Sequence, residues 1–72
     1  MFNSNNISIK DGRYYCTCLV SSEAIAKEFV ANHIIHVRTI DPSSEIFYQG
    51  NLVTISTTNK NSLKYIIAHL AK

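Results

Sequence analysis

Two cysteines and two of the three histidines stand at spacings short enough to act together. Cys16 and Cys18 are one residue apart, and His33 and His36 are separated by two residues. Thiolate and imidazole groups suit copper or zinc, so a metal site in this chain would use these four residues. On a strand, however, both thiols point to one side, about 6.5 Å apart along the chain, which does not favour a disulfide. We therefore predict reduced, buried cysteines, no metal site and no cofactor.

The sequence contains no arrangement typical of catalysis. It has no carboxylate pair on one predicted face, no glycine-rich phosphate loop and no nucleophile elbow. Asp11 and Asp41 fall in predicted turns, where such side chains usually stabilise the turn itself. With only two glycines and no second domain to form a cleft, we predict a protein that is not an enzyme.

Composition indicates one small soluble domain over residues 1–72, with the polar residues 1–6 expected to be disordered. The chain is 46% hydrophobic and 17% charged, and its net charge of +2 is too small to indicate nucleic acid by itself. No apolar run approaches the roughly 20 residues of a membrane span, and no leader is evident, so we expect a cytoplasmic protein without membrane contact. A core this small favours a homo-oligomer.

The first half of the sequence predicts a hairpin followed by a helix. Ile7 and Ile9 alternate with polar residues, and Asp11-Gly12 then predicts a two-residue turn into a strand over Arg13–Val20. Ser21 and Ser22 are good N-cap residues. The apolar spacing beyond them predicts a helix from Glu23 to Asn32 or His33.

The second half predicts three strands and a closing helix. The segment Ile34–Ile40 is rich in β-branched residues, which is typical of a strand. After a turn at Asp41–Ser44, the expected elements are an extended segment over Glu45–Gln49, a turn at Gly50-Asn51, a strand over Leu52–Thr58, and a helix capped within Asn59–Ser62 and running to Lys72. The order is ββαβββα. It predicts a two-layer α+β sandwich with both helices on one face of an antiparallel-rich sheet.

Alternation along the strands divides side chains between the helix-facing side and an open side. The expected helix-facing residues are Cys16, Cys18, Val20, Ile35, Val37, Ile46, Tyr48, Val53 and Ile55. The expected open-side residues are Arg13, Tyr15, Thr17, Leu19, His36, Arg38, Phe47, Gln49, Thr54 and Ser56. Of these, the candidate partner-binding residues are Arg13, Tyr15, His36, Arg38, Phe47 and Gln49.

This mixture of aromatic, basic and hydroxyl side chains is typical of a protein contact, either with a second copy or with a partner. It leaves a single-stranded RNA interface open as an alternative, with Tyr15 and Phe47 stacking on bases beside Arg13 and Arg38. Our main hypothesis is a non-catalytic interaction protein. Its Asn-, Ile-, Ser- and Lys-rich composition is similar to that of small phage and mobile-element accessory proteins that inhibit or sequester host components.

Several short motifs, in order, resemble one known family over residues 16–70. They are Cys16-Thr17-Cys18, Ile25-Ala26-Lys27, Phe29-Val30, Pro42, Ile46-Phe47-Tyr48, Gly50 and Thr57-Thr58 before an amphipathic helix. This pattern is similar to the CutA divalent-cation tolerance proteins. The resemblance implies a ferredoxin-like fold, trimers and copper binding. The family's fourth strand has no counterpart after the second predicted helix, so we expect the N-terminal strand to occupy that edge, in a permuted ferredoxin-like sheet.

Overall fold

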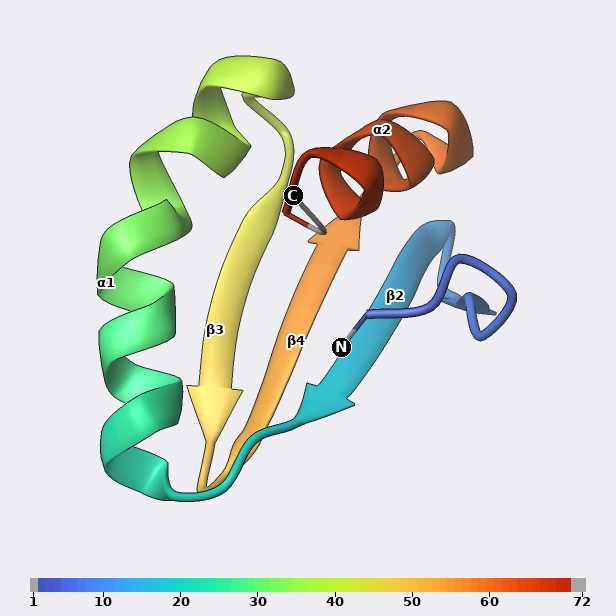
Figure 1. Cartoon of the computed structure of the whole chain (residues 1–72). Coiled ribbons are helices and arrows are strands. Elements are labelled where there is room, and N and C mark those ends of the chain that lie inside the picture. The colour runs from blue at the N-terminus through green and yellow to red at the C-terminus, as the bar shows by residue number, and fades with distance from the viewer. Residues whose placement is uncertain (1, 71–72) are drawn as a thin grey trace.

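The computed structural model describes residues 2–70 and contains four strands and two helices (Figure 1). The elements are β1 (Ser8–Lys10), β2 (Arg13–Leu19), α1 (Glu23–Ile40), β3 (Glu45–Gln49), β4 (Leu52–Thr57) and α2 (Lys60–Leu70). The order is therefore ββαββα, with one strand fewer than the sequence predicted. The expected extension of the last helix to Lys72 lies outside the described residues.

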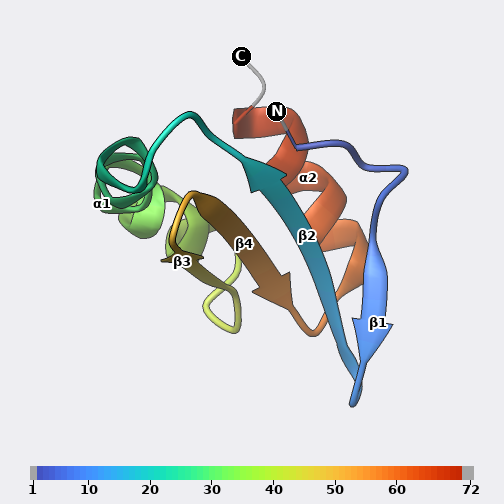
Figure 2. The same cartoon turned by 90° about the horizontal axis from the view of Figure 1, so that it is seen from below.

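The four strands form one antiparallel sheet in the order β1-β2-β4-β3. Strands β2 and β3 both run antiparallel to β4, so they run parallel to each other on either side of it, joined by α1. Helix α1 packs mainly against β3, and α2 packs against β4 and β2. Figures 1 and 2 show both helices on the same side of the sheet, which confirms the predicted two-layer α+β arrangement.

Both predicted hairpin turns are present. Asp11 and Gly12 have φ values of 53° and 78°, the pair of positive angles that a two-residue type I′ turn requires. Gly50 has a φ of 58°, as expected for the first position of a type II′ turn. These turns set the register of β1 on β2 and of β3 on β4, so they determine which side chains reach each face of the sheet.

The prediction of a strand over Ile34–Ile40 was wrong, because this segment forms the last two turns of α1. The β-branched side chains suggested a strand, but a helical stripe continues through Ile34, Val37 and Ile40, each of which packs into the core. Helix α1 ends at Ile40 because Asp41 precedes a proline and adopts an extended conformation. Its start was predicted correctly, with the Ser22 hydroxyl accepting a hydrogen bond from the Ile25 N–H.

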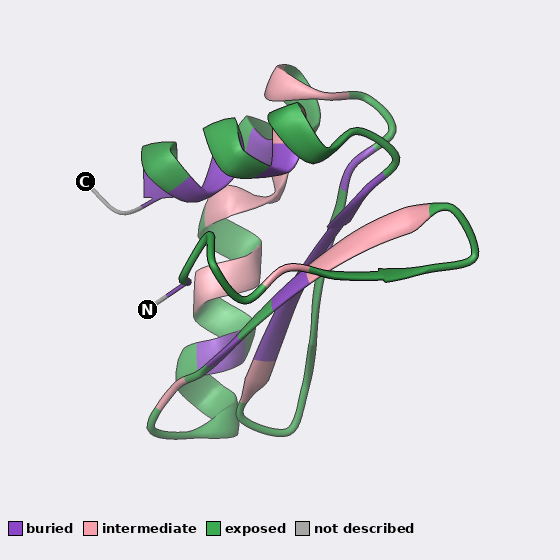
Figure 3. Ribbon diagram, turned by 90° about the vertical axis from the view of Figure 1, so that its right-hand side faces the viewer, coloured by how far each residue is buried: buried purple, intermediate pink, exposed green. Residues whose placement is uncertain are grey.

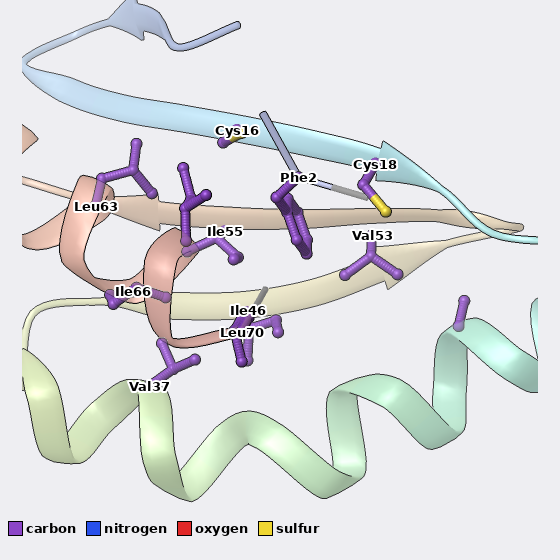
Figure 4. Close-up of a cluster of buried hydrophobic side chains, with 12 residues drawn as sticks. Phe2, Cys16, Cys18, Val37, Ile46, Val53, Ile55, Leu63, Ile66 and Leu70 are labelled. Carbon is purple, nitrogen blue, oxygen red and sulfur yellow. The ribbon is translucent and has the colours of Figure 1, made fainter. Parts of the chain in front are cut away.

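The core lies between the sheet and the two helices (Figures 3 and 4). Ile55, Val53 and Cys16 supply it from the sheet. The helices contribute Ala26, Val37, Leu63, Ile66, Ile67 and Leu70. Phe2 also packs in this core, with its ring centroid 6.0 Å from that of Phe29, so the polar segment that we expected to be disordered contributes a core side chain.

The predicted alternation holds in the strands that exist. Cys16, Cys18, Val53, Ile55 and Ile46 are buried on the helix side. Tyr48 pairs with Val53 and therefore lies on the same side. Val20, just after β2, is half-buried against the core. Ile35 was wrongly expected in the core, because on a helix it points away from the stripe and is 76% exposed.

Candidate interaction surface

The open face of the sheet is ordered in rows that the strand register defines. One row joins Leu19, Leu52 and Gln49 across β2, β4 and β3. The next row joins Thr17, Thr54 and Phe47, and a third joins Ser8, Tyr15, Ser56 and Glu45. The face is therefore more apolar at the Leu19 end and more polar toward Ser56.

Several apolar side chains on the open face are exposed, although the same strands are well packed on the helix side. Leu19 is 71% exposed and Phe47 is 43% exposed, while Tyr15 and Leu52 are half-buried. A contiguous apolar patch on a sheet face often marks a protein contact, and Leu19 pairs with Leu52 here. Leu52 and Glu45 were missing from the predicted surface, although extending the alternation of β4 and β3 by one step would have included both.

Arg13 lies on the open face but is held by its own chain. Its Nε donates to the Ser56 hydroxyl at 2.8 Å, and its Nη2 donates to the Ser43 carbonyl at 3.0 Å. These bonds join β2 to β4 and to the turn after α1. The guanidinium is thus a structural clamp at the polar end of the face, and part of its donor capacity is already used.

His36 and Arg38 were predicted on the open face and are not there. Both belong to α1, on the opposite side of the sheet, and both are exposed. Residues two positions apart on a helix point about 160° away from each other, so His36 and Arg38 occupy different flanks of α1. His36 faces α2, where its ring meets His69 edge-on with centroids 5.5 Å apart. Of the six predicted partner-binding residues, the open face therefore carries Arg13, Tyr15, Phe47 and Gln49.

The two cysteines are free and buried, as predicted. The Cys16 thiol donates to the Asn3 carbonyl at 3.5 Å, and that of Cys18 to the Leu19 carbonyl at 3.7 Å. Burial raises the pKa of Cys16, which disfavours the thiolate that nucleophilic or metal-binding chemistry needs. In this structure these thiols are small core side chains.

The structure does not bring together the two cysteines and two histidines that a metal site in this chain would use. Within residues 2–70, no three His, Cys, Asp or Glu side chains lie close enough to hold a metal ion. His33 stacks on Phe29, with ring centroids 4.2 Å apart, and its Nδ1 is 2.8 Å from the Phe29 carbonyl oxygen. His36 lies about one turn further along the same helix, and its ring is next to that of His69 on α2.

Asp41 forms a polar junction that sequence reasoning recognised only in part. Its carboxylate accepts from the Thr57 hydroxyl at 2.6 Å, and from the Ser43 hydroxyl and N–H at 2.8 and 2.9 Å. The Thr57 bond, followed by those from Ser43, lowers the pKa of Asp41 to about 2. The turn role was predictable from Asp41-Pro42, but the bond to Thr57 depends on the tertiary fold. The junction joins the end of α1 to β4.

A shallow hollow of about 580 Å³ lies between the N-terminal turn and α2. Its lining includes Phe2, Asn3, Asn5 and Lys64. Asn3 already accepts hydrogen bonds from the Asn5 and Asn6 backbone N–H groups, which hold the turn closed. The polar side chains named in this lining are amides and one lysine, which form no cluster of reactive groups.

Comparison of the chain with protein-family models, curated proteins and solved structures gave no match. The similarity to CutA therefore stays a prediction that depends on the short motifs alone. In the described part of the chain, neither helix is both long enough and apolar enough to cross a membrane.

Proposed function

We propose that this chain is a small, non-catalytic protein-binding module that docks a partner protein on the open face of its sheet. The observation that carries the proposal is the exposure of Leu19 and Phe47 on a face that neither helix of the described chain covers. Inhibition or sequestration of the partner, as by small phage or mobile-element proteins, is one form this function takes.

The composition of the face supports a separate partner over a permanent dimer made by two such faces. Core regions of homodimer interfaces are more apolar than ordinary protein surface, whereas dissociable interfaces resemble that surface in composition. Here Leu19 and Phe47 alternate with Thr17, Gln49 and Glu45, all exposed. An aromatic and an aliphatic anchor within a polar rim fit a dissociable contact.

The test compares two exposed apolar residues on opposite sides of the molecule. A partner is first isolated with the intact chain and produced as pure protein, and its affinity for each variant is then measured by calorimetry. We expect Leu19→Asp to weaken binding at least tenfold, because it places a charge at the apolar end of the face. Ile35→Asp is the matched control, since Ile35 is 76% exposed on α1, and it should leave the affinity unchanged.

Two results would contradict this function. One is a partner whose affinity falls with Ile35→Asp but not with Leu19→Asp. The other is that every partner isolated with the intact chain binds the Leu19→Asp variant as tightly as it binds the parent chain. Both substituted side chains are exposed, so both variants should remain folded. Far-ultraviolet circular dichroism checks that they do.

We propose in addition that the sheet is a circularly permuted form of the ferredoxin-like sheet. The order β1-β2-β4-β3 supports this, since β1 occupies the edge that the last strand of that fold would occupy. The cytoplasm is the proposed compartment, where the two thiols would remain reduced. Metal binding receives less support because the cysteines and histidines are separated, and RNA binding because Arg38 is on α1 and Arg13 is already bonded.

A further inference from the structure

Two histidines from different helices meet on the helix side of the sheet. His36 belongs to α1 and His69 to the last turn of α2, and their rings lie edge-on with centroids 5.5 Å apart. Both side chains are exposed. Among the described residues, neither ring forms a hydrogen bond of the kind that His33 forms with its own helix, at the Phe29 carbonyl oxygen. The ring nitrogens of the pair are therefore accessible to an ion from solution.

The backbone at both histidines is held in place by the core. His36 precedes Val37, which is fully buried. His69 precedes Leu70, which is also buried. Helices α1 and α2 contact each other directly and lie on the same side of the sheet (Figure 1). Packing therefore fixes the distance between the two helices, and only side-chain torsions must change for both rings to reach one ligand. Such preorganisation lowers the entropy cost of binding.

The separation of the rings fits one metal ion and indicates its coordination geometry. Imidazole binds Zn²⁺ through nitrogen at about 2.0–2.1 Å, so two imidazoles on one tetrahedral ion have ring centroids roughly 5 Å apart. Two neighbouring imidazoles on a square-planar ion, a geometry typical of Cu²⁺, have centroids roughly 4.5 Å apart. The observed 5.5 Å is closer to the tetrahedral value. The rings must turn from their edge-on contact to direct both nitrogens at the ion, and their exposure leaves room for that rotation.

We propose that His36 and His69 form a binding site for Zn²⁺ that links α1 to α2, with one imidazole nitrogen from each and water in the other two positions. The site is separate from the four residues predicted for a metal, because it shares only His36 with them and uses no thiolate. Within residues 2–70, no third His, Cys, Asp or Glu completes it. Structural zinc sites usually have four protein ligands and catalytic sites three. An ion with two protein ligands is therefore bound reversibly.

This site goes beyond the proposed docking function and does not depend on it. The two histidines lie on the helix side, whereas Leu19 and Phe47 lie on the open face of the sheet. Leu19→Asp should therefore leave the zinc affinity unchanged, and His36→Gln should leave the affinity for a partner protein unchanged. Failure of one proposal is thus distinguishable from failure of the other.

Calorimetric titration of the intact chain with zinc chloride tests the site, at about pH 7.5, where most free imidazole is neutral. His36→Gln and His69→Gln each remove one of the two protein ligands, and each should weaken zinc binding at least tenfold. His33→Gln is the matched control, because His33 lies one turn away on α1 with its ring stacked on Phe29, and it should change the affinity less than about twofold. Magnesium chloride should not bind, since Mg²⁺ prefers oxygen ligands.

Two further measurements show where the ion binds and what it links. Zinc should shift the ¹⁵N NMR signals of the ring nitrogens of His36 and His69, and it should leave those of His33 unchanged. Excess zinc should also raise the melting temperature by several degrees, because an ion that bridges two helices binds the folded chain in preference to the unfolded one. Both His→Gln variants should lose that rise and remain folded, since both side chains are exposed.

Four outcomes would overturn the proposal. The first is a parent chain that binds no zinc at concentrations up to about 1 mM. The second is a zinc affinity that either His36→Gln or His69→Gln leaves unchanged. The third is a loss of affinity with His33→Gln as large as that with His36→Gln. The fourth is zinc that shifts the Cβ signals of the two cysteines instead of the imidazole signals, which would assign the ion to the thiols.

Discussion

The two faces of the sheet use the same strands for different purposes. On the helix side, Val53, Ile55 and Cys16 are at most 1% exposed and meet side chains from both helices. On the open side, Leu19 and Phe47 remain largely accessible. Burial of apolar area is the main source of folding free energy, so stability is concentrated on one face. The other face is left able to vary and to bind.

The open face is nevertheless not loosely built. Ser56 and Thr54 on central strand β4 are only 1% and 8% exposed, although neither helix covers them. Neighbouring strands shield them, and the Ser56 hydroxyl accepts a hydrogen bond from Arg13 Nε. The central strand thus gives the open face a firm, partly polar base. Such a surface needs little reordering when it binds.

The largest contrast between the faces should come from truncating one apolar side chain on each. Ile55→Ala removes a fully buried side chain between β2, β3 and the helices, and we expect a loss of about 3 kcal/mol in the free energy of unfolding. Leu19→Ala should change it by less than about 0.5 kcal/mol, because Leu19 is mostly in water already. Urea denaturation measures both. Similar losses in the two variants would refute the division of roles between the faces.

The same contrast explains which parts of the fold the sequence could predict. Alternation identified the buried side of β2, β3 and β4, because one face of each strand must meet an apolar layer. Glycine at positions with positive φ identified both turns. These signals are local, and each has one dominant physical cause.

The prediction of a strand over Ile34–Ile40 failed because two local signals disagreed. Its β-branched residues favour a strand, while Ile34, Val37 and Ile40 continue the apolar stripe of the helix before them. Packing against β3 decided in favour of the helix. Two candidate contact residues, His36 and Arg38, were misplaced for that reason alone. The Asp41–Thr57 bond was beyond prediction for a different reason, because it joins residues 16 positions apart.

A smaller effect should arise at Asp41, where the helix side of β4 meets the turn after α1. The pKa of Asp41 is about 2 in the fold and 3.8 in the reference state, so its ionised form stabilises the folded chain. That contribution is fully present above about pH 4 and is lost as the pH falls through about 2. Asp41→Asn removes the charged hydrogen bonds, so it should lower the free energy of unfolding at pH 7 by about 1–2 kcal/mol. The free energy of unfolding of this variant should also depend less on pH between pH 4 and 2.

Asp11→Asn is the matched control for that prediction. Asp11 lies in the β1–β2 turn with a φ of 53°, a conformation that asparagine adopts readily. This variant should keep the parent's acid dependence between pH 4 and 2. Thermal melts across this range compare the three proteins. An Asp41→Asn variant with an unchanged pH profile would show that the junction with Thr57 and Ser43 contributes nothing to stability.

The smallest effect should come from two adjacent residues of β4 that point to opposite faces. Thr57→Val removes the hydroxyl that donates to Asp41 from a fully buried position, so it should cost about 1 kcal/mol and raise the pKa of Asp41. Ser56→Ala removes only the acceptor for Arg13 Nε, and the half-buried guanidinium can turn to water, so we expect less than about 0.5 kcal/mol. Urea melts and an NMR titration of the Asp41 carboxyl provide the two measurements. If Ser56→Ala proved the more costly, the Arg13 clamp would be a main support of the fold, and the open face could not be treated as independent of stability.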